Sequence, residues 1–259
     1  MKTALPLFLG LLISCPAFAQ TTTPLTTEPP PPIPLTNSAV NGVEDMFSLS
    51  GTLALTSNYI ASGVSQTDND PALQGSFNAL TKYGIYGEVW ASTVNFPNGY
   101  GNTAYLESDW SIGYQNQYQD LSYDFGYVYY FYPGSVELDY GEIFLDLGYN
   151  IFNAEIKYTP NASNEGENGV YVEGGATVPI LPKYAFGLKD LEVGGTLGYS
   201  WYSGNLSTED YVNWELFLQK TWHERMVTQL AYTDTEGETG TPDHLDGAKI
   251  SGTITLLLF

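Results

Sequence analysis

The chain of 259 residues carries 29 acidic but only 8 basic residues, which gives a formal net charge of -21 at pH 7. This charge argues against recognition of nucleic acid through a basic surface. Aromatic residues make up 15% of the chain, and this content excludes a disordered acidic protein, because disordered segments are poor in aromatic side chains.

Residues 1–19 have the features of a secretory signal peptide. A positive start at Lys2 precedes a short apolar run, Leu5 to Ile13, and the Ala17-Phe18-Ala19 cleavage site. The apolar run is too short to cross a bilayer as a helix. We therefore expect the chain to be exported, with residues 20–45 as the start of the mature protein.

The single cysteine, Cys15, lies within this signal peptide, so we expect the mature chain to have no thiol. Leu12-Ile13-Ser14-Cys15 resembles a lipoprotein cleavage box, which would leave a lipidated cysteine. Pro16 directly after the cysteine favours ordinary cleavage instead. Lipidation of Cys15 stays open as the weaker alternative.

Residues 20–45 are rich in threonine and proline, with four prolines in a row at Pro29–Pro32. Such a stretch is extended and unable to build a packed core. It predicts a periplasmic tether. A proline-rich ligand for a partner protein is the alternative.

From Met46 onward, side-chain alternation predicts about twelve antiparallel strands. The pattern is clearest in Leu121–Phe131, where every odd position is aromatic or leucine, which is typical of a strand with two unlike faces. The predicted strands are Phe47–Thr56, Leu73–Ala79, Ile85–Val94, Leu106–Tyr114, Leu121–Phe131, Val136–Tyr149, Phe152–Tyr158, Gly169–Pro179, Leu191–Trp201, Val212–Trp222, Met226–Thr233 and Lys249–Phe259. The apolar phase changes within Val136–Tyr149, and we expect a β-bulge near Tyr140-Gly141.

The connections between these strands alternate in length. Most odd-numbered strands are followed by longer polar loops, and most even-numbered strands by short turns. The exceptions are the short Pro133-Gly134 and the long Ile180–Asp190. Long external loops, short periplasmic turns and an even strand count are typical of outer-membrane barrels.

The fold class predicted for residues 46–259 is therefore all-β, a transmembrane antiparallel up-and-down β-barrel. A secreted soluble β-sandwich also shows alternating strands. That alternative would have to bury every aromatic face, and it does not explain the apolar C-terminus, Ile254–Phe259. We therefore favour the barrel.

Three stretches carry a family resemblance. The stretch Asn58–Gly75, followed by Tyr130–Gly134 and Asp139–Glu142, resembles the TorF-type porin family of uncharacterised proteobacterial outer-membrane proteins. The resemblance implies an outer-membrane pore, without an established substrate or catalytic residues. Ser62 occupies the position where the family leads us to expect arginine. A role of that arginine in the lumen is therefore not expected in this chain.

The terminal Phe259 resembles the aromatic signal that the outer-membrane assembly machinery reads, and this machinery is an expected partner. Counting back in steps of two, Leu257 fits the signal but Thr255 and Thr253 are polar. The apolar set is Ile254, Leu256 and Leu258 instead.

If the apolar faces meet lipid, the opposite faces line the barrel. The candidate pore-lining residues are then Glu88, Glu107, Asp109, Asp124, Glu142, Asp146, Glu155, Lys157, Glu173, Glu192, Glu215 and Lys249. An acid-rich lumen attracts cations and repels anions. Lys220 shares the apolar face and lies near the periplasmic end, where its ammonium can reach the interface.

Catalysis and metal binding find little support. Barrel enzymes that act on lipids use Ser-His pairs, but His223 lies in an expected turn and His244 in an acidic loop. His223-Glu224 lacks the second histidine of a zinc-protease motif. Asp68-Asn69-Asp70 is more simply a turn than a calcium loop. We expect no enzyme activity, no metal and no cofactor.

The sequence thus predicts an outer-membrane channel for passive diffusion of small solutes, with cations favoured, surrounded by outer-membrane lipids. Two alternatives stay open: a barrel enzyme that acts on lipids, and a structural or adhesive barrel without conduction. Narrow barrels are often filled by side chains, so a plugged lumen is the competing arrangement.

Overall fold

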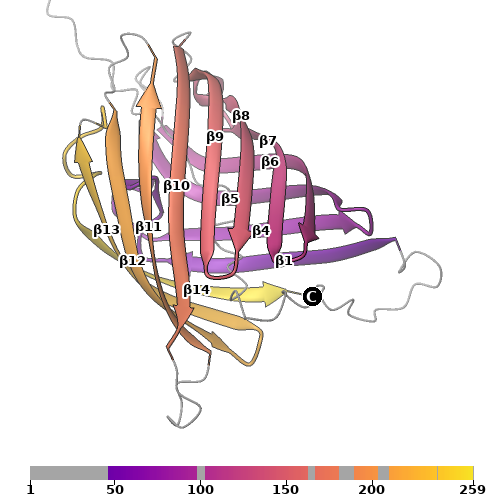
Figure 1. Cartoon of the computed structure of the whole chain (residues 1–259). Coiled ribbons are helices and arrows are strands. Elements are labelled where there is room, and N and C mark those ends of the chain that lie inside the picture. The colour runs from indigo at the N-terminus through magenta and orange to yellow at the C-terminus, as the bar shows by residue number, and fades with distance from the viewer. Residues whose placement is uncertain are drawn as a thin grey trace, which may run out of the picture.

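The computed structural model describes residues 46–97, 103–162, 167–180, 190–203, 210–237 and 239–258 (Figure 1). The predicted signal peptide, the predicted tether and Phe259 lie outside the described residues. No helix in the described part of the chain is long and apolar enough to cross a membrane.

Twelve strands close into one barrel, which confirms the predicted fold class. In chain order they are β1 (Phe47–Thr56), β4 (Ala72–Thr81), β5 (Ile85–Pro97), β6 (Thr103–Tyr118), β7 (Leu121–Phe131), β8 (Tyr140–Tyr149), β9 (Phe152–Ala162), β10 (Glu167–Pro179), β11 (Leu191–Tyr202), β12 (Tyr211–Trp222), β13 (Met226–Gly237) and β14 (Lys249–Leu258). Each strand pairs antiparallel with its neighbours in the chain, and β1 pairs with β14 to close the ring.

The alternation in sequence divides the barrel into an outer and an inner face. In β7, Phe125, Tyr127 and Tyr129 are exposed on the outside, whereas Val128 and Tyr130 are completely buried. The other strands follow the same pattern, and their outer faces carry Leu53, Leu55, Phe77, Trp110, Ile112, Ile143, Leu197, Leu216, Leu230, Ile254 and Leu256 as exposed apolar side chains. A continuous apolar outer surface on a closed barrel is the surface that lipid covers.

One predicted strand begins later than expected. Val136–Leu138 forms a single 3-10 turn, and β8 starts only at Tyr140. The pairing of β7 with β8 then runs without a shift, so the predicted bulge near Tyr140-Gly141 is wrong. The change of phase arises because the residues before Tyr140 belong to a connection, not to the strand. That connection is also longer than the predicted Pro133-Gly134 turn.

The irregular pairings lie elsewhere. The register shifts between Thr93 and Phe96 in β5, and again between Glu167 and Gly169 in β10. An extra residue at such a point bends the strand and re-aims the side chains that follow. In β5, both Val94 and Phe96 are buried at this point.

A segment that follows β1 turns into the barrel. We call residues 57–71 the inward hairpin, because two short paired strands, β2 (Ile60–Ala61) and β3 (Val64–Ser65), form its centre. The side chains of its central part are almost fully covered, with Ala61, Val64, Ser65 and Gln66 each 2% exposed or less, whereas residues 68–71 at its end are exposed. Ser62, at the tip, is also buried. The hairpin therefore packs inside the barrel.

The inward hairpin is fixed to the wall on opposite sides. Near its base, the Tyr59 hydroxyl donates to the Glu107 carboxylate of β6 over 3.0 Å. At its tip, the Thr235 hydroxyl of β13 donates to the Gly63 carbonyl over 2.8 Å. The tip also lies against Asn213 of β12. Because β6 and β12 stand six places apart in the ring of twelve strands, the hairpin bridges the lumen.

Gly63 allows this close approach, and replacing it tests the arrangement. It has φ +83°, and an added Cβ would lie 2.6 Å from the Asn213 Cβ. Gly134 has the same φ of +83°, but an added Cβ meets nothing within 4 Å. We expect Gly134→Ala to cost about 1 kcal/mol from backbone strain alone. Gly63→Ala should cost about 2–4 kcal/mol, because overpacking adds to the strain.

The measurement is denaturant unfolding of the refolded variants in detergent micelles. Equal losses of unfolding free energy in the two variants would contradict the close packing of Gly63 on β12.

Candidate functional site: the acidic barrel interior

The predicted pore-lining residues all lie on strand faces opposite the exposed apolar side chains. Six of them are packed by protein, with 6% exposure or less: Glu107, Asp109, Asp124, Glu142, Lys157 and Glu192. The other six are half-buried: Glu88, Asp146, Glu155, Glu173, Glu215 and Lys249. The structure thus gathers the predicted set inside the barrel, and their lining of an open pore stays a prediction.

Four of these carboxylates stand in direct register on adjacent strands. Asp124 of β7 is paired with Asp146 of β8, Asp146 with Glu155 of β9, and Glu155 with Glu173 of β10. We call these four residues the carboxylate row. Like charges placed directly opposite each other destabilise a sheet, so the row is an arrangement that packing alone would not favour.

Lys157 supplies the compensating positive charge. Its ammonium lies 2.9 Å from the Glu155 carboxylate and 5.5 Å from the centre of the Tyr171 ring. Lys157 is completely buried, whereas the Glu155 side chain is 13% exposed. Lys157 and Glu155 thus form an ion pair inside the barrel.

Tyrosine hydroxyls donate hydrogen bonds to two of the other three carboxylates of the row, and one oxygen of the third, Asp146, is buried without a partner among the described residues. The Tyr86 hydroxyl donates to Asp124 over 3.0 Å, and the Tyr171 hydroxyl donates to Glu173 over 2.8 Å. Hydrogen bonds to an ionised acceptor are stronger than neutral ones, so they offset part of the cost of burying charge.

Glu107 and Glu142, which lie nearer the long loops than the carboxylate row does, also accept hydrogen bonds from hydroxyl groups. Glu107 accepts hydrogen bonds from Tyr59 over 3.0 Å and from Tyr132 over 2.7 Å. Glu142 accepts a hydrogen bond from Tyr130 over 2.7 Å and a second from Thr159. Asp109 differs, because neither of its carboxylate oxygens has a hydrogen-bond partner in the described part of the chain.

The last predicted residues have local polar partners. Glu192 accepts a hydrogen bond from Gln219 over 2.8 Å, Glu215 from Thr233 over 3.2 Å, and Glu88 from Asn78 over 3.3 Å. Lys249 donates to the backbone carbonyl of Asp246. These groups are spread around the inner wall and do not converge on one point.

The aromatic residues of the interior were not predicted from the sequence, because aromatic faces were assigned to lipid. Tyr86, Trp90, Tyr130, Tyr132 and Phe144 form a buried cluster with the inward hairpin. Tyr130 stacks on Tyr140 with ring centres 4.4 Å apart, and Trp90 meets Tyr59 edge-to-face at 5.4 Å. Strand parity could have shown this, since Tyr86 and Trp90 share the face of Glu88.

The two histidines lie outside the acidic interior of the barrel. His223 lies in the tight turn between β12 and β13, with φ +51°. His244 pairs with Asp68 at 2.8 Å, and both side chains are exposed. Among the described residues, no group of three or more His, Cys, Asp or Glu side chains is arranged to hold a metal ion. Lys220 lies on the outer side, with its ammonium 4.8 Å from the centre of the Trp222 ring.

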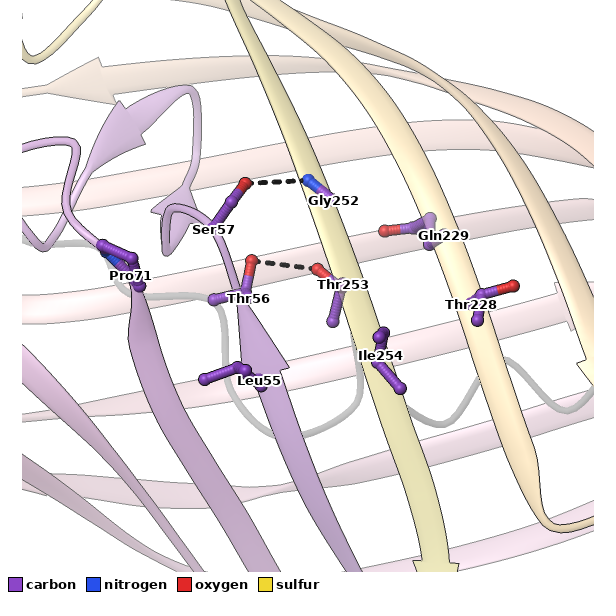
Figure 2. Close-up of a pocket in the computed structure, with 9 residues that line it drawn as sticks. All are labelled: Leu55, Thr56, Ser57, Pro71, Thr228, Gln229, Gly252, Thr253 and Ile254. Carbon is purple, nitrogen blue, oxygen red and sulfur yellow. Dashed lines mark hydrogen bonds between the residues drawn. The ribbon is translucent and has the colours of Figure 1, made fainter.

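A groove of about 480 Å³ lies in the wall where β1, β14 and β13 meet (Figure 2). Its lining residues are Leu55, Thr56, Ser57, Pro71, Thr228, Gln229, Gly252, Thr253 and Ile254. Hydrogen bonds from the Gly252 amide to the Ser57 hydroxyl and between the Thr56 and Thr253 hydroxyls cross it, each 2.9 Å long. The lining contains no ionisable side chain, so the groove is separate from the acidic interior.

Solved structures show the same architecture. The NanC porin has a TM-score of 0.51 at 12% sequence identity, and the match covers 82% of this chain and 99% of that chain. The KdgM porin has a TM-score of 0.48 at 10% identity, with 82% and 99% covered. An outer membrane channel from Pseudomonas putida F1 has a TM-score of 0.42 at 9% identity, with 82% and 96% covered. The likeness to NanC shows a porin-like barrel fold.

The comparison with curated proteins finds no match. In the comparison with family models, residues 41–256 match a family described as "Bacterial protein of unknown function (Gcw_chp)". This does not confirm the name of the TorF-type family that the sequence resembles. Because the match covers most of the chain and all the described strands begin within it, the chain belongs to the Gcw_chp family of bacterial proteins.

Proposed function

We propose that this protein is an outer-membrane channel for passive diffusion of small solutes, with a preference for cations. The proposal is carried by the different composition of the two faces of the barrel wall. The inner face has the carboxylate row and further acidic residues but only two basic ones, Lys157 and Lys249, among the predicted pore-lining residues. The outer face is apolar. Rings of carboxylates inside a pore favour cations over anions.

The remaining features fit the same setting. An apolar outer face requires lipid around the barrel, and the signal peptide predicted in residues 1–19 would direct export to the outer membrane. Insertion there would depend on the assembly machinery that reads the C-terminal segment. NanC, whose fold this barrel shares, is itself described as a porin. We propose no enzymatic role, because His223 and His244 lie in a turn and a loop, away from the interior acids.

The inward hairpin narrows the lumen at the end with the long connections. It enters from the end with long connections, whereas Asp124, Asp146 and Glu155 each lie three residues from a strand end that borders a short turn. Three members of the row, Asp146, Glu155 and Glu173, are half-buried and not fully covered. Solutes would therefore meet the carboxylate row on one side of the hairpin, near the short turns.

The double variant Asp146→Asn/Glu173→Gln tests the cation preference. Both changes conserve shape and remove two ionisable carboxyl groups from the row, so the cation preference should weaken. The measurement is the reversal potential of single channels in a planar bilayer under a potassium chloride gradient, which should move toward zero. Asp120→Asn/Glu236→Gln is the matched control, because it removes two exposed charges outside the lumen.

An unchanged reversal potential in the lumenal variant would contradict the assignment of the row to the conducting path. An equal shift in the control variant would mean that overall charge, and not the row, sets the selectivity.

Removal of the inward hairpin tests where the path is narrowest. Thr56 and Ala72 are paired across β1 and β4, so replacing residues 58–70 with Gly-Gly leaves a short loop between the two strands. We expect a larger single-channel conductance with the cation preference retained, because the hairpin bridges the lumen. Circular dichroism and the heat-dependent gel mobility of the folded barrel serve as the control for folding.

The covered interior is the observation that favours a second candidate function, a structural barrel that does not conduct. The two candidates give different results in the same experiment. A folded wild-type barrel without current, beside a conducting hairpin deletion, would make the hairpin a permanent plug. Absence of current from both folded proteins would exclude the channel.

A further inference from the structure

We propose that Asp109 of β6 is the binding point for a primary organic ammonium group inside the barrel. The inference rests on the proposed cation-preferring lumen and names the class of cation that the lumen would take. It is carried by the burial of Asp109, by the lack of a donor to its carboxylate, and by the aromatic residues on both neighbouring strands.

Among the described interior acids, Asp109 is the one with both carboxylate oxygens buried and without a hydrogen-bond donor. The residue is 1% exposed, and neither carboxylate oxygen meets a hydrogen-bond donor among the described residues. Glu107, two residues away on the same face, accepts two tyrosine hydroxyls. An ionised carboxylate is costly to bury unless a cation or donors compensate it. A protonated amine supplies both at once, because it is a cation with three donors.

The neighbours of Asp109 suit an organic cation. Its direct partners across the two strand pairs are Trp90 of β5 and Tyr130 of β7. Both share its inward face, and both are buried, with 3% and 0% exposure. Aromatic rings attract ammonium groups, with tryptophan and tyrosine the strongest, and the attraction grows as water is excluded.

A metal ion fits this place less well. Mg²⁺ and Ca²⁺ need several converging oxygen ligands, and the described residues contain no group of three acids arranged in that way. The oxygens of Glu107 and Glu142 already accept hydroxyl groups. One free carboxylate between two aromatic side chains is the arrangement that selects an alkylammonium ion over a bare metal ion.

The inward hairpin covers this place. Tyr59 contacts the Trp90 ring and donates its hydroxyl to Glu107, and Asp109 itself is almost inaccessible to solvent. Binding therefore requires Tyr59 to move away from Trp90. The ligand would then take the position beside the carboxylate that the hairpin now closes off.

The test is isothermal titration of the refolded protein in detergent with n-butylammonium chloride at neutral pH and constant ionic strength. We expect saturable binding to the wild-type protein and about tenfold or greater loss of affinity in Asp109→Asn, which keeps the shape but removes the charge. Asp120→Asn lies on the hairpin of the same two strands, β6 and β7, is exposed, and should bind like the wild type.

Two probes separate this site from simple alternatives. 1-Butanol, which matches the chain length without the charge, should not bind measurably, and exchanging potassium for sodium at the same ionic strength should not alter the affinity for butylammonium. Equal affinity of Asp109→Asn and wild type would overturn the proposal. So would binding of 1-butanol as tight as that of butylammonium, or complete displacement by sodium.

A stability measurement guards against misfolding as the cause of lost binding. Asp109→Asn should unfold at the same or a higher denaturant concentration than wild type, because it removes a buried carboxyl group that has no hydrogen-bond donor among the described residues. Glu107→Gln should unfold at a lower one, because it weakens two charge-assisted hydrogen bonds. A clear loss of stability in Asp109→Asn would mean that the carboxylate has a structural partner, and would contradict the proposal.

These titrations need no ionic current, so the two proposals can fail separately. Saturable, Asp109-dependent binding by a barrel that never conducts would refute the channel alone. A cation-selective current from a barrel without such binding would refute the ammonium site alone.

Discussion

Closure of the strand ring is the constraint on which the rest of this structure depends. Backbone groups surrounded by lipid must all find partners within the protein, and an open sheet edge leaves a row of them unpaired. The closing seam joins β1 and β14 through six residue pairs, from Gly51–Leu258 to Thr56–Thr253. Beyond the last pair, Ser57 and Gly252 continue the contact through two more hydrogen bonds. The inward hairpin begins at that same point.

Once the ring is closed, alternation sends every second side chain inward, and the interior must accommodate a large acidic charge. The tyrosine hydroxyls are the main solution: Tyr59, Tyr86, Tyr130, Tyr132 and Tyr171 each donate to an interior carboxylate. The same rings fill the space between the strands. One residue type thus supplies both the packing and many of the donors. The ammonium proposal is built on Asp109, both of whose carboxylate oxygens are buried without a donor among the described residues.

Strand parity also explains which sequence predictions succeeded. The two faces of Leu121–Phe131 could be predicted, because parity depends only on the chain itself. That the acids from Glu88 to Glu215 line an open pore stays a prediction. The bulge near Tyr140-Gly141 was wrong, because the change of phase comes from the turn at Val136–Leu138. Interior aromatics such as Trp90 and Tyr132 were overlooked, because hydrophobicity alone does not distinguish a lipid-facing ring from one packed inside a barrel.

The sequence by itself determined the fold class, the approximate strand limits and the acidic character of the inner face, because each depends on residues near one another in the chain. Only the tertiary structure decided which acids are neighbours, as in the carboxylate row, since cross-strand register is set by ring closure. It also decided that residues 57–71 fold inward, because this depends on Glu107, Asn213 and Thr235 far along the chain.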